Sequence, residues 1–198
     1  TAIETKRFTA ASVLNDAPEV YDLWKPKNYE KEAFRGPVRL RVGLAHSINT
    51  VAIRLLSEVG IGSLREMATR VGITSPITEE MGLSLALGSL TVTPVELAHA
   101  YLPFFNGGRR IVSSLVTKVV NEAQPVVEPA RAMDPETAFV VLSMMKSVVT
   151  EGTARAAVGM GRPVAGKTGT SNDQRDAWFA GATADLLAVV WVGFDDMQ

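Results

Sequence analysis

The C-terminal stretch of the chain, residues 163–194, has the sequence PVAGKTGTSNDQRDAWFAGATADLLAVVWVGF. Strand-forming residues gather in three segments, at 163–170, 177–183 and 186–194, and these segments predict three successive strands. The connections between them are short and polar. Links of that length join antiparallel neighbours, because a parallel crossover needs a dozen residues or more. The stretch therefore predicts a three-stranded antiparallel sheet.

Helical patterns precede this sheet. Apolar residues recur near helical spacing in 38–71, and within that range Ser63, followed three residues later by Glu66, matches a capping box that would start a second helix. A Thr-Pro pair opens a helix over 93–105, and an Asp-Pro pair opens another over 134–149. Helices packed over an antiparallel sheet define the α+β class, which is the fold we expect.

The remaining segments are less regular. Residues 1–37 contain scattered apolar residues and prolines, which predict an extended segment over the core after a short helical start. Residues 73–93 are rich in Gly, Ser and Thr and are expected to form a long loop. The β-branched run at 111–120 predicts a strand that pairs with residues 126–127 as a hairpin.

The composition excludes several classes of function. The 198 residues include 20 basic and 21 acidic side chains. The chain therefore lacks the excess of positive charge that is typical of proteins that bind nucleic acid. The absence of cysteine excludes disulfides and thiolate nucleophiles, and two histidines are too few for a multi-histidine metal site. No apolar run is long enough to cross a bilayer, so no membrane contact is expected within this chain.

Residues 161–168, GRPVAGKT, match the phosphate-binding pattern G-x-x-x-x-G-K-[ST]. A phosphate-binding loop follows a buried strand and opens a helix. Here the preceding segment is rich in Gly and Ala, and the following segment, 169–176, is a polar turn. A P-loop nucleotide-binding enzyme is therefore the least favoured of the functions that we consider.

The same lysine belongs to a second pattern, Lys167-Thr-Gly-Thr, which lies about 120 residues after Ser47-Ile-Asn49. Each residue type suits acyl transfer to or from a peptide. A lysine on a strand attracts a carboxylate, a serine hydroxyl both donates and accepts a proton, and an asparagine holds an amide from both ends. Gly169 lets a peptide lie close along the strand edge, and Thr170 offers a hydroxyl for a carboxylate and a backbone N–H for an oxyanion. Either motif alone also occurs by chance, and Ser-x-Asn alone is commonly a helix cap.

Further motifs identify a family. Residues 83–101, LSLALGSLTVTPVELAHAY, and the FNGG that ends at Gly108 are its most specific stretch. Before it, FRGP at 34–37 leads to AHSIN at 45–49, as in the family's approach to its S-x-N motif. After it, EGTA at 151–154, KTGT from Lys167, DAWF at 176–179 and WVGFD from Trp191 follow in the family's order. The chain resembles, over nearly its whole length, the transpeptidase domain of class A penicillin-binding proteins. This family also uses K-T-G with an S-x-N motif, here with Ile48 in the middle position.

The resemblance implies a serine D,D-transpeptidase that cross-links peptidoglycan stem peptides ending in D-Ala-D-Ala and binds β-lactams as substrate mimics. It assigns proton relay to Ser47, substrate positioning to Asn49 and electrostatic stabilisation to Lys167. Substrate binding and the oxyanion contact fall to Thr168, Gly169 and Thr170. It implies no metal and no organic cofactor. It also implies an extracytoplasmic domain of a membrane-anchored parent protein.

The family's nucleophile lies in an S-x-x-K motif before S-x-N, and residues 1–46 contain no such motif. The formal match at Ser143, SMMK, comes after S-x-N and lies in an apolar helical segment, so we interpret it as structural. We therefore expect residues 1–198 to be a single partial transpeptidase domain without the nucleophile helix and the C-terminal helix. Such a chain is expected to be inactive alone and to bind the N-terminal part of the same parent. The alternative is a non-catalytic module of the same fold that binds peptide or peptidoglycan.

Overall fold

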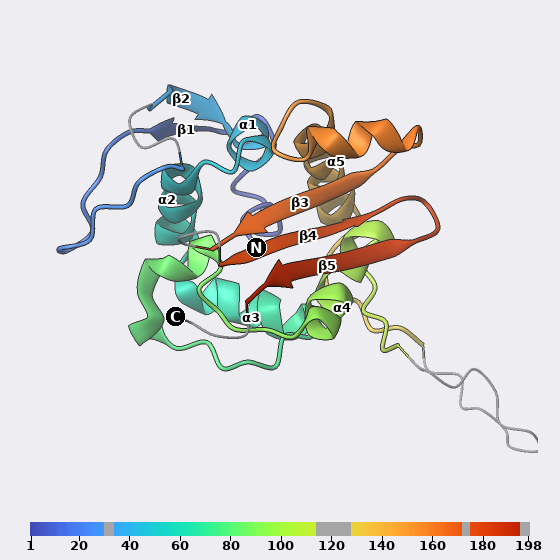
Figure 1. Ribbon diagram of the computed structural model, residues 1–198. Helices are drawn as coiled ribbons and strands as arrows, with labels where there is room; N and C mark the ends of the chain where they lie inside the picture. The colour runs from blue at the N-terminus through green and yellow to red at the C-terminus, as the bar shows by residue number, and fades with distance from the viewer. Residues whose placement is uncertain (30–33, 114–127, 172–174, 195–198) are drawn as a thin grey trace, which may run out of the picture.

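The computed structural model describes residues 1–29, 34–113, 128–171 and 175–194 (Figure 1). Its central feature is the predicted antiparallel sheet, formed by β3 (Ala165–Thr170), β4 (Asp176–Ala182) and β5 (Leu187–Gly193) in the order β3-β4-β5. Lys167 lies opposite Ala180 in this register. The three strands predicted from the sequence are confirmed.

A second sheet lies near the N-terminus, where the sequence predicts an extended segment up to residue 37 and helix from residue 38. It consists of β1 (Val13–Asp16) and β2 (Gly36–Arg39), paired antiparallel with Leu14 opposite Val38. Each strand has four residues, which is too short for an alternating pattern to stand out in the sequence. Leu14 and Val38 are both buried and join the strands to the helical core.

Three helices follow β2: α1 (Leu40–Ala45), α2 (Asn49–Val59) and α3 (Ile61–Val71). The prediction that Ser63 caps the third is wrong, because the helix begins two residues earlier and Gly60 occupies its cap position. Gly60 has φ +82°, a conformation that glycine adopts without strain. This residue therefore joins α2 to α3 directly, with no loop in which a serine cap would be needed.

Helices α4 (Pro94–Phe105) and α5 (Pro135–Thr150) agree with the sequence prediction, and the Thr93 hydroxyl accepts a hydrogen bond from the backbone N–H of Glu96, as in an N-cap. The long loop predicted before α4 is partly wrong, since it contains a 3₁₀ segment, η1 (Glu79–Leu87), with Leu85 buried.

A shorter 3₁₀ segment, η2 (Arg155–Met160), follows α5. Of the predicted strand at 111–120, residues 111–113 are not in a strand, and 114–120 and 126–127 lie outside the described residues. Residue Arg110 instead donates its backbone N–H to the carbonyl of Ala130, close to the bridge between Arg109 and Arg131.

The core joins the helices to the sheet. Helix α5 packs against β3, and α4 packs against β4 and β5 (Figure 1). Val148 and Val149 of α5 form one buried cluster with Val164, and Phe179 of β4 packs against it. A second cluster joins β1, β2, α1, α2 and α5 through Leu40, Val51 and Met144. These contacts confirm the α+β class. Among the described residues, no helix has the length and apolar character required to cross a membrane.

Candidate active site

Ser47 lies in the turn that links α1 to α2. Its φ is +53°, a left-handed value that is uncommon for a residue with a side chain. Two backbone hydrogen bonds close the turn, from Ser47 N–H to the Leu44 carbonyl (3.2 Å) and from Ile48 N–H to the Gly43 carbonyl (2.9 Å). A Cβ at Gly43 would lie 2.7 Å from a methyl carbon of Val51, so the close approach of the two helices requires glycine.

The side chain of Lys167, on strand β3, reaches this turn. Its Nζ donates one hydrogen bond to the Ser47 Oγ and another to the Thr168 carbonyl, each at 2.9 Å. The structure thus brings together two of the predicted site residues, 120 positions apart in the chain. The Ser47 side chain is exposed, so the contact lies at a surface that a ligand can reach.

The ammonium of Lys167 is half-buried. Burial lowers its pKa to about 8, because the charged form loses hydration. Within the described part of the chain, Lys167 forms no ion pair with a carboxylate. At neutral pH this lysine therefore presents a positive charge that an incoming carboxylate could neutralise.

Thr168, Gly169 and Thr170 continue β3 beyond the lysine. Strand β3 pairs only with β4 among the described strands, so its other edge is unpaired there. The Thr168 hydroxyl lies 2.6 Å from that of Thr153, whereas Thr170 is exposed at the strand end. Gly169 lies opposite Trp178, and a Cβ at Gly169 would approach the Trp178 Cβ to 3.3 Å. An extended peptide can add to such an edge through main-chain hydrogen bonds.

Asn49 is the predicted residue that the structure does not join to the lysine. It is the first residue of α2, and its Nδ2 donates to the Lys27 carbonyl at 2.7 Å. The segment around Lys27 therefore occupies the donor that the sequence analysis assigns to substrate. No sequence pattern indicates this contact, because it joins single residues 22 positions apart.

The end of α5 fixes the turn relative to the sheet. The backbone N–H of Thr153 donates to the Ala45 carbonyl at 3.1 Å, while the Thr153 hydroxyl contacts Thr168. A Cβ at Gly152 would lie 2.1 Å from the same Ala45 oxygen, so only glycine fits there. Thr153 is a site residue to which the sequence analysis assigned no role, although it lies within the EGTA motif.

The formal S-x-x-K match at 143–146 has a structural environment. The Ser143 hydroxyl accepts a hydrogen bond from Arg41 Nη2 at 3.1 Å, and its carbonyl accepts one from Nη1 at 2.7 Å. Lys146 is exposed, and the neighbouring Met144 and Met145 are buried. The rejection of this match as a nucleophile motif therefore agrees with its packing.

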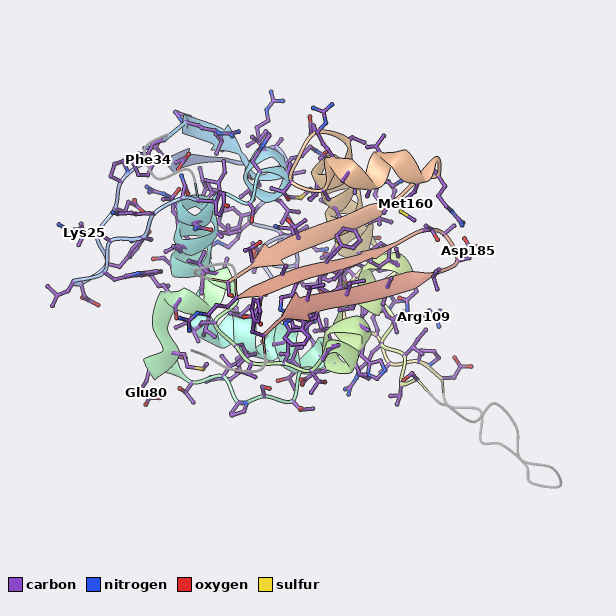
Figure 2. The ribbon with its side chains drawn as sticks, in the orientation of Figure 1. Lys25, Phe34, Glu80, Arg109, Met160 and Asp185 are labelled. Atoms are coloured by element: carbon purple, nitrogen blue, oxygen red, sulfur yellow. The ribbon has the colours of Figure 1, made fainter. Side chains whose placement is uncertain are left out.

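The phosphate-loop alternative lacks its structural context. The lysine of GRPVAGKT lies within strand β3, and the next described element is β4 and not a helix whose N-terminus could bind phosphate. Arg162, in the same pattern, instead pairs with Asp185 at 2.9 Å. This pair lies at the end of the sheet that is opposite Thr170, where Figure 2 labels Asp185 and Met160. The described residues also contain no cluster of His, Asp or Glu that could hold a metal ion.

The family model for the penicillin binding protein transpeptidase domain matches residues 1–193. This chain belongs to the penicillin-binding protein transpeptidase family. It is 38% identical over 209 residues to penicillin-binding protein 1A of Neisseria gonorrhoeae, an alignment that covers 96% of this chain and 26% of that protein. It is 42% identical over 178 residues to penicillin-binding protein 1A of Aquifex aeolicus, covering 87% of this chain and 24% of the relative.

Solved structures agree with this membership. The crystal structure of penicillin-binding protein 1A from Haemophilus influenzae superposes with a TM-score of 0.86 at 30% identity, covering 98% of this chain and 36% of that one. The structure of a Mycobacterium tuberculosis penicillin-binding protein has a TM-score of 0.83 at 23% identity, which supports the fold. The family predicted from the motifs is confirmed. The chain spans about a quarter of the length of these curated relatives.

Proposed function

We propose that this chain carries part of the active site of a peptidoglycan D,D-transpeptidase that forms a serine acyl-enzyme on stem peptides ending in D-Ala-D-Ala. The observation that carries the proposal is the 2.9 Å hydrogen bond from Lys167 Nζ to Ser47 Oγ, beside the edge of β3 that no other described strand pairs with. Membership of the transpeptidase family supports the same reaction class.

Each site residue has a role in this reaction. The Lys167 ammonium attracts the terminal carboxylate of the stem peptide. Ser47 already accepts an N–H from Lys167, so its own hydroxyl proton can pass to the leaving amine. Asn49 positions a substrate amide once its Nδ2 leaves the Lys27 carbonyl. Thr168 and Gly169 hold the peptide along β3, and the Thr170 N–H donates to the oxyanion.

In the covalent step, a serine Oγ attacks the carbonyl carbon between the two D-alanines. The new ester bond forms as the C–N bond breaks, and the terminal D-alanine leaves as an amine after it receives the serine proton. An amine of a second stem peptide then attacks the ester, restores the serine hydroxyl and completes the cross-link. A β-lactam would follow the first step, with its ring amide in place of the peptide bond.

The nucleophilic serine of this reaction is not found among residues 1–46, which contain no S-x-x-K motif. We propose that the N-terminal part of the same parent supplies it, so that residues 1–198 form a single partial transpeptidase domain without the nucleophile helix and the C-terminal helix. The apolar surface at the outer strand β5 supports this proposal. Val190, Val192 and Phe194 are at least half exposed there, and exposed apolar patches mark contact surfaces.

The remaining assignments follow from the same function. The proposed partners are peptidoglycan stem peptides and β-lactams, and no organic cofactor or metal has a role in the chemistry. The parent is proposed to be membrane-anchored, with this domain outside the cytoplasm, where peptidoglycan is cross-linked.

A second candidate function is a non-catalytic module that binds peptide or peptidoglycan. It is favoured by three features: a β3 edge that no other described strand pairs with, a Lys167 that forms no ion pair with a described carboxylate, and no S-x-x-K motif in residues 1–46. Such a module would bind the substrate but form no ester.

Labelling with a fluorescent penicillin separates these functions. We expect covalent labelling of the protein that carries its native upstream segment and no labelling of residues 1–198 alone. Labelling of the shorter chain would contradict the assignment of the nucleophile. Reversible binding of a D-Ala-D-Ala peptide without any covalent label in the longer protein would instead support the binding module.

A further inference from the structure

Asp16 is a buried carboxylate that no step of the proposed reaction uses. It is the last residue of β1 and is 1% exposed. Burial alone would raise its pKa, but hydrogen bonds from Thr50, Asn28 and the backbone of Arg35 outweigh burial and lower the pKa below its usual value. An ionised carboxylate is costly to bury, so a cluster of three donors around it indicates a defined role.

The three donors come from three separate segments. The Thr50 hydroxyl and the Asn28 Nδ2 both bind Oδ1 of Asp16, at 2.5 and 2.8 Å, and the Arg35 backbone N–H binds Oδ2 at 2.9 Å. The Asn28 Oδ1 in turn accepts the backbone N–H of Thr50 at 3.3 Å. Asp16, Asn28 and Thr50 therefore form a closed ring of hydrogen bonds, which we call the Asp16 cluster.

The Asp16 cluster supplies the hydrogen-bond acceptor and the negative charge that the residues at the start of α2 do not provide. The cap residue Ile48 has no side chain that can accept a hydrogen bond, and the first turn of α2 contains no acidic residue. Free N–H groups and a partial positive charge gather at a helix N-terminus. Asn28 satisfies one of these N–H groups, and the Asp16 carboxylate places a negative charge beside the first turn.

The cluster also lies next to both reactive positions of the S-x-N motif. Thr50 directly follows Asn49, whose amide donates to the carbonyl of Lys27, the residue before Asn28. Ser47, three residues before Thr50, has the strained φ of +53°, and such a conformation persists only where the surroundings fix it. Figure 2 shows Lys25 of the same segment extending away from the molecule, whereas Pro26 is buried and Glu19 pairs with Arg54 of α2.

We propose that Asp16 is a positioning residue, which holds the Ser47–Asn49 turn in register with Lys167 by anchoring Thr50 and Asn28. This inference rests on the proposed transpeptidase function. In this proposal Asp16 acts through Thr50 and Asn28 and not on the substrate itself. Without the Thr50 hydroxyl, the first turn of α2 loses its direct bond to Asp16 of β1 and keeps only the indirect link through Asn28. We expect the Ser47 hydroxyl to move relative to Lys167 Nζ as a result.

The test uses the protein with its native upstream segment and measures penicillin acylation as two quantities, the dissociation constant of the non-covalent complex and the acylation rate constant. Thr50→Val keeps the shape but removes the hydroxyl donor, and Thr50→Ser keeps the donor. Thr137→Val is the matched control, because Thr137 is a buried threonine whose hydroxyl has no partner in the described structure.

We expect Thr50→Val to lower the acylation rate constant about ten- to a hundredfold, the scale of a displaced reacting group, with the dissociation constant little changed. Thr50→Ser is expected to restore most of the rate, and Thr137→Val to leave it unchanged. Asp16→Asn should slow acylation as well. The rate constant refers only to the labelled, folded fraction, so a loss of stability alone would lower the amplitude and not the rate.

An unchanged rate constant in Thr50→Val, or equally slow Ser and Val variants at position 50, would overturn the proposal. If Asp16→Asn does not fold, the comparison of Thr50→Val with Thr50→Ser tests the proposal on its own. If the unsubstituted protein forms no adduct, the transpeptidase function itself fails. Amide hydrogen exchange then tests the anchor separately, since the proposal expects faster exchange at Ile48 and Thr50 in Thr50→Val and no change in Thr137→Val.

Discussion

The turn that carries Ser47 and the strand that carries Lys167 contribute one side chain each to the same hydrogen bond, but they are held in different ways. All six residues of β3 are paired with β4 in a regular register. The turn is closed by two local backbone hydrogen bonds, but its position relative to the sheet depends on single contacts from distant segments, through Asp16, Asn28 and the Thr153 N–H. One partner of the site is therefore fixed by repeated local geometry and the other by individual long-range bonds.

This difference predicts where the site is vulnerable. A substitution in β3 removes one of several equivalent pairings, and the neighbouring pairings preserve the register. A substitution in a residue that supports the turn removes one of a few long-range bonds that no regular ladder repeats, and we expect Ser47 to move relative to Lys167. Remote residues should therefore affect the turn more than the strand.

The largest effect is expected from removing the charge that the two regions share. Lys167→Ala should lower the rate of penicillin acylation in the protein with its upstream segment about 10²- to 10³-fold, as for other preorganised electrostatic contacts. Stopped-flow fluorescence with a labelled penicillin measures this rate. Lys146→Ala is the control, because Lys146 is exposed on α5. Equal losses of acylation rate in the two variants would contradict the electrostatic role assigned to Lys167.

The next effect is on stability and concerns the contact between Gly152 and Ala45, which aligns the Ser47 turn with the sheet. Gly152→Ala places a Cβ where the Ala45 oxygen lies 2.1 Å away, and we expect a loss of about 1–3 kcal/mol in the free energy of unfolding, the usual cost of overpacking. Urea denaturation measures it. Gly62→Ala, in α3 with open space around it, should instead stabilise by about 0.5–1 kcal/mol. A neutral Gly152 variant would show that the junction is not tightly packed.

A smaller effect on the acylation rate is expected from the contact between Thr153 and Thr168 of β3. Thr153→Val removes the hydroxyl that lies 2.6 Å from the Thr168 hydroxyl. The loss of one hydrogen bond of about 1 kcal/mol corresponds to roughly fivefold slower acylation. Thr153→Ser keeps the hydroxyl and should retain the rate. If the serine variant is as slow as the valine variant, the methyl group and not the hydrogen bond matters.

The smallest effect is a dependence on pH. The Lys167 pKa of about 8 lies below the usual value for lysine, so its positive charge is lost as the pH rises through 8. From pH 7 to 8.5 the protonated fraction falls about fourfold, and the dissociation constant of a carboxylate-bearing peptide should rise by about the same factor. Titration calorimetry tests this prediction. Lys167→Gln should bind weakly with no such change, and a flat profile in the unsubstituted protein would contradict the electrostatic role.

Regular features of this molecule were predictable from the sequence. The strands β3, β4 and β5 and the helices α4 and α5 carry periodic apolar patterns or Thr-Pro and Asp-Pro starts, which are local signals. The approach of Lys167 to Ser47 followed from the family's motifs, and the structure places their side chains 2.9 Å apart. Periodicity alone could not have paired two residues so far apart.

The features that were missed are single polar contacts between distant segments. Asp16 lies in a strand too short to give an alternating pattern, and nothing marks Asn28 as the residue that supports α2. Asn49 was expected to face substrate, but its amide donates to Lys27. Burial of a carboxylate is decided by the packing of the whole fold, so the Asp16 cluster leaves no signal in the sequence.

Mass-spectrometric mapping of the penicillin adduct tests the central claim most directly. The protein with its native upstream segment would be labelled, digested and sequenced to locate the modified serine. We predict a single ester on a serine that precedes Thr1, which would make residues 1–198 the part of the site that binds and relays protons. An ester on Ser143, or the absence of any adduct from a protein that binds penicillin, would contradict the account.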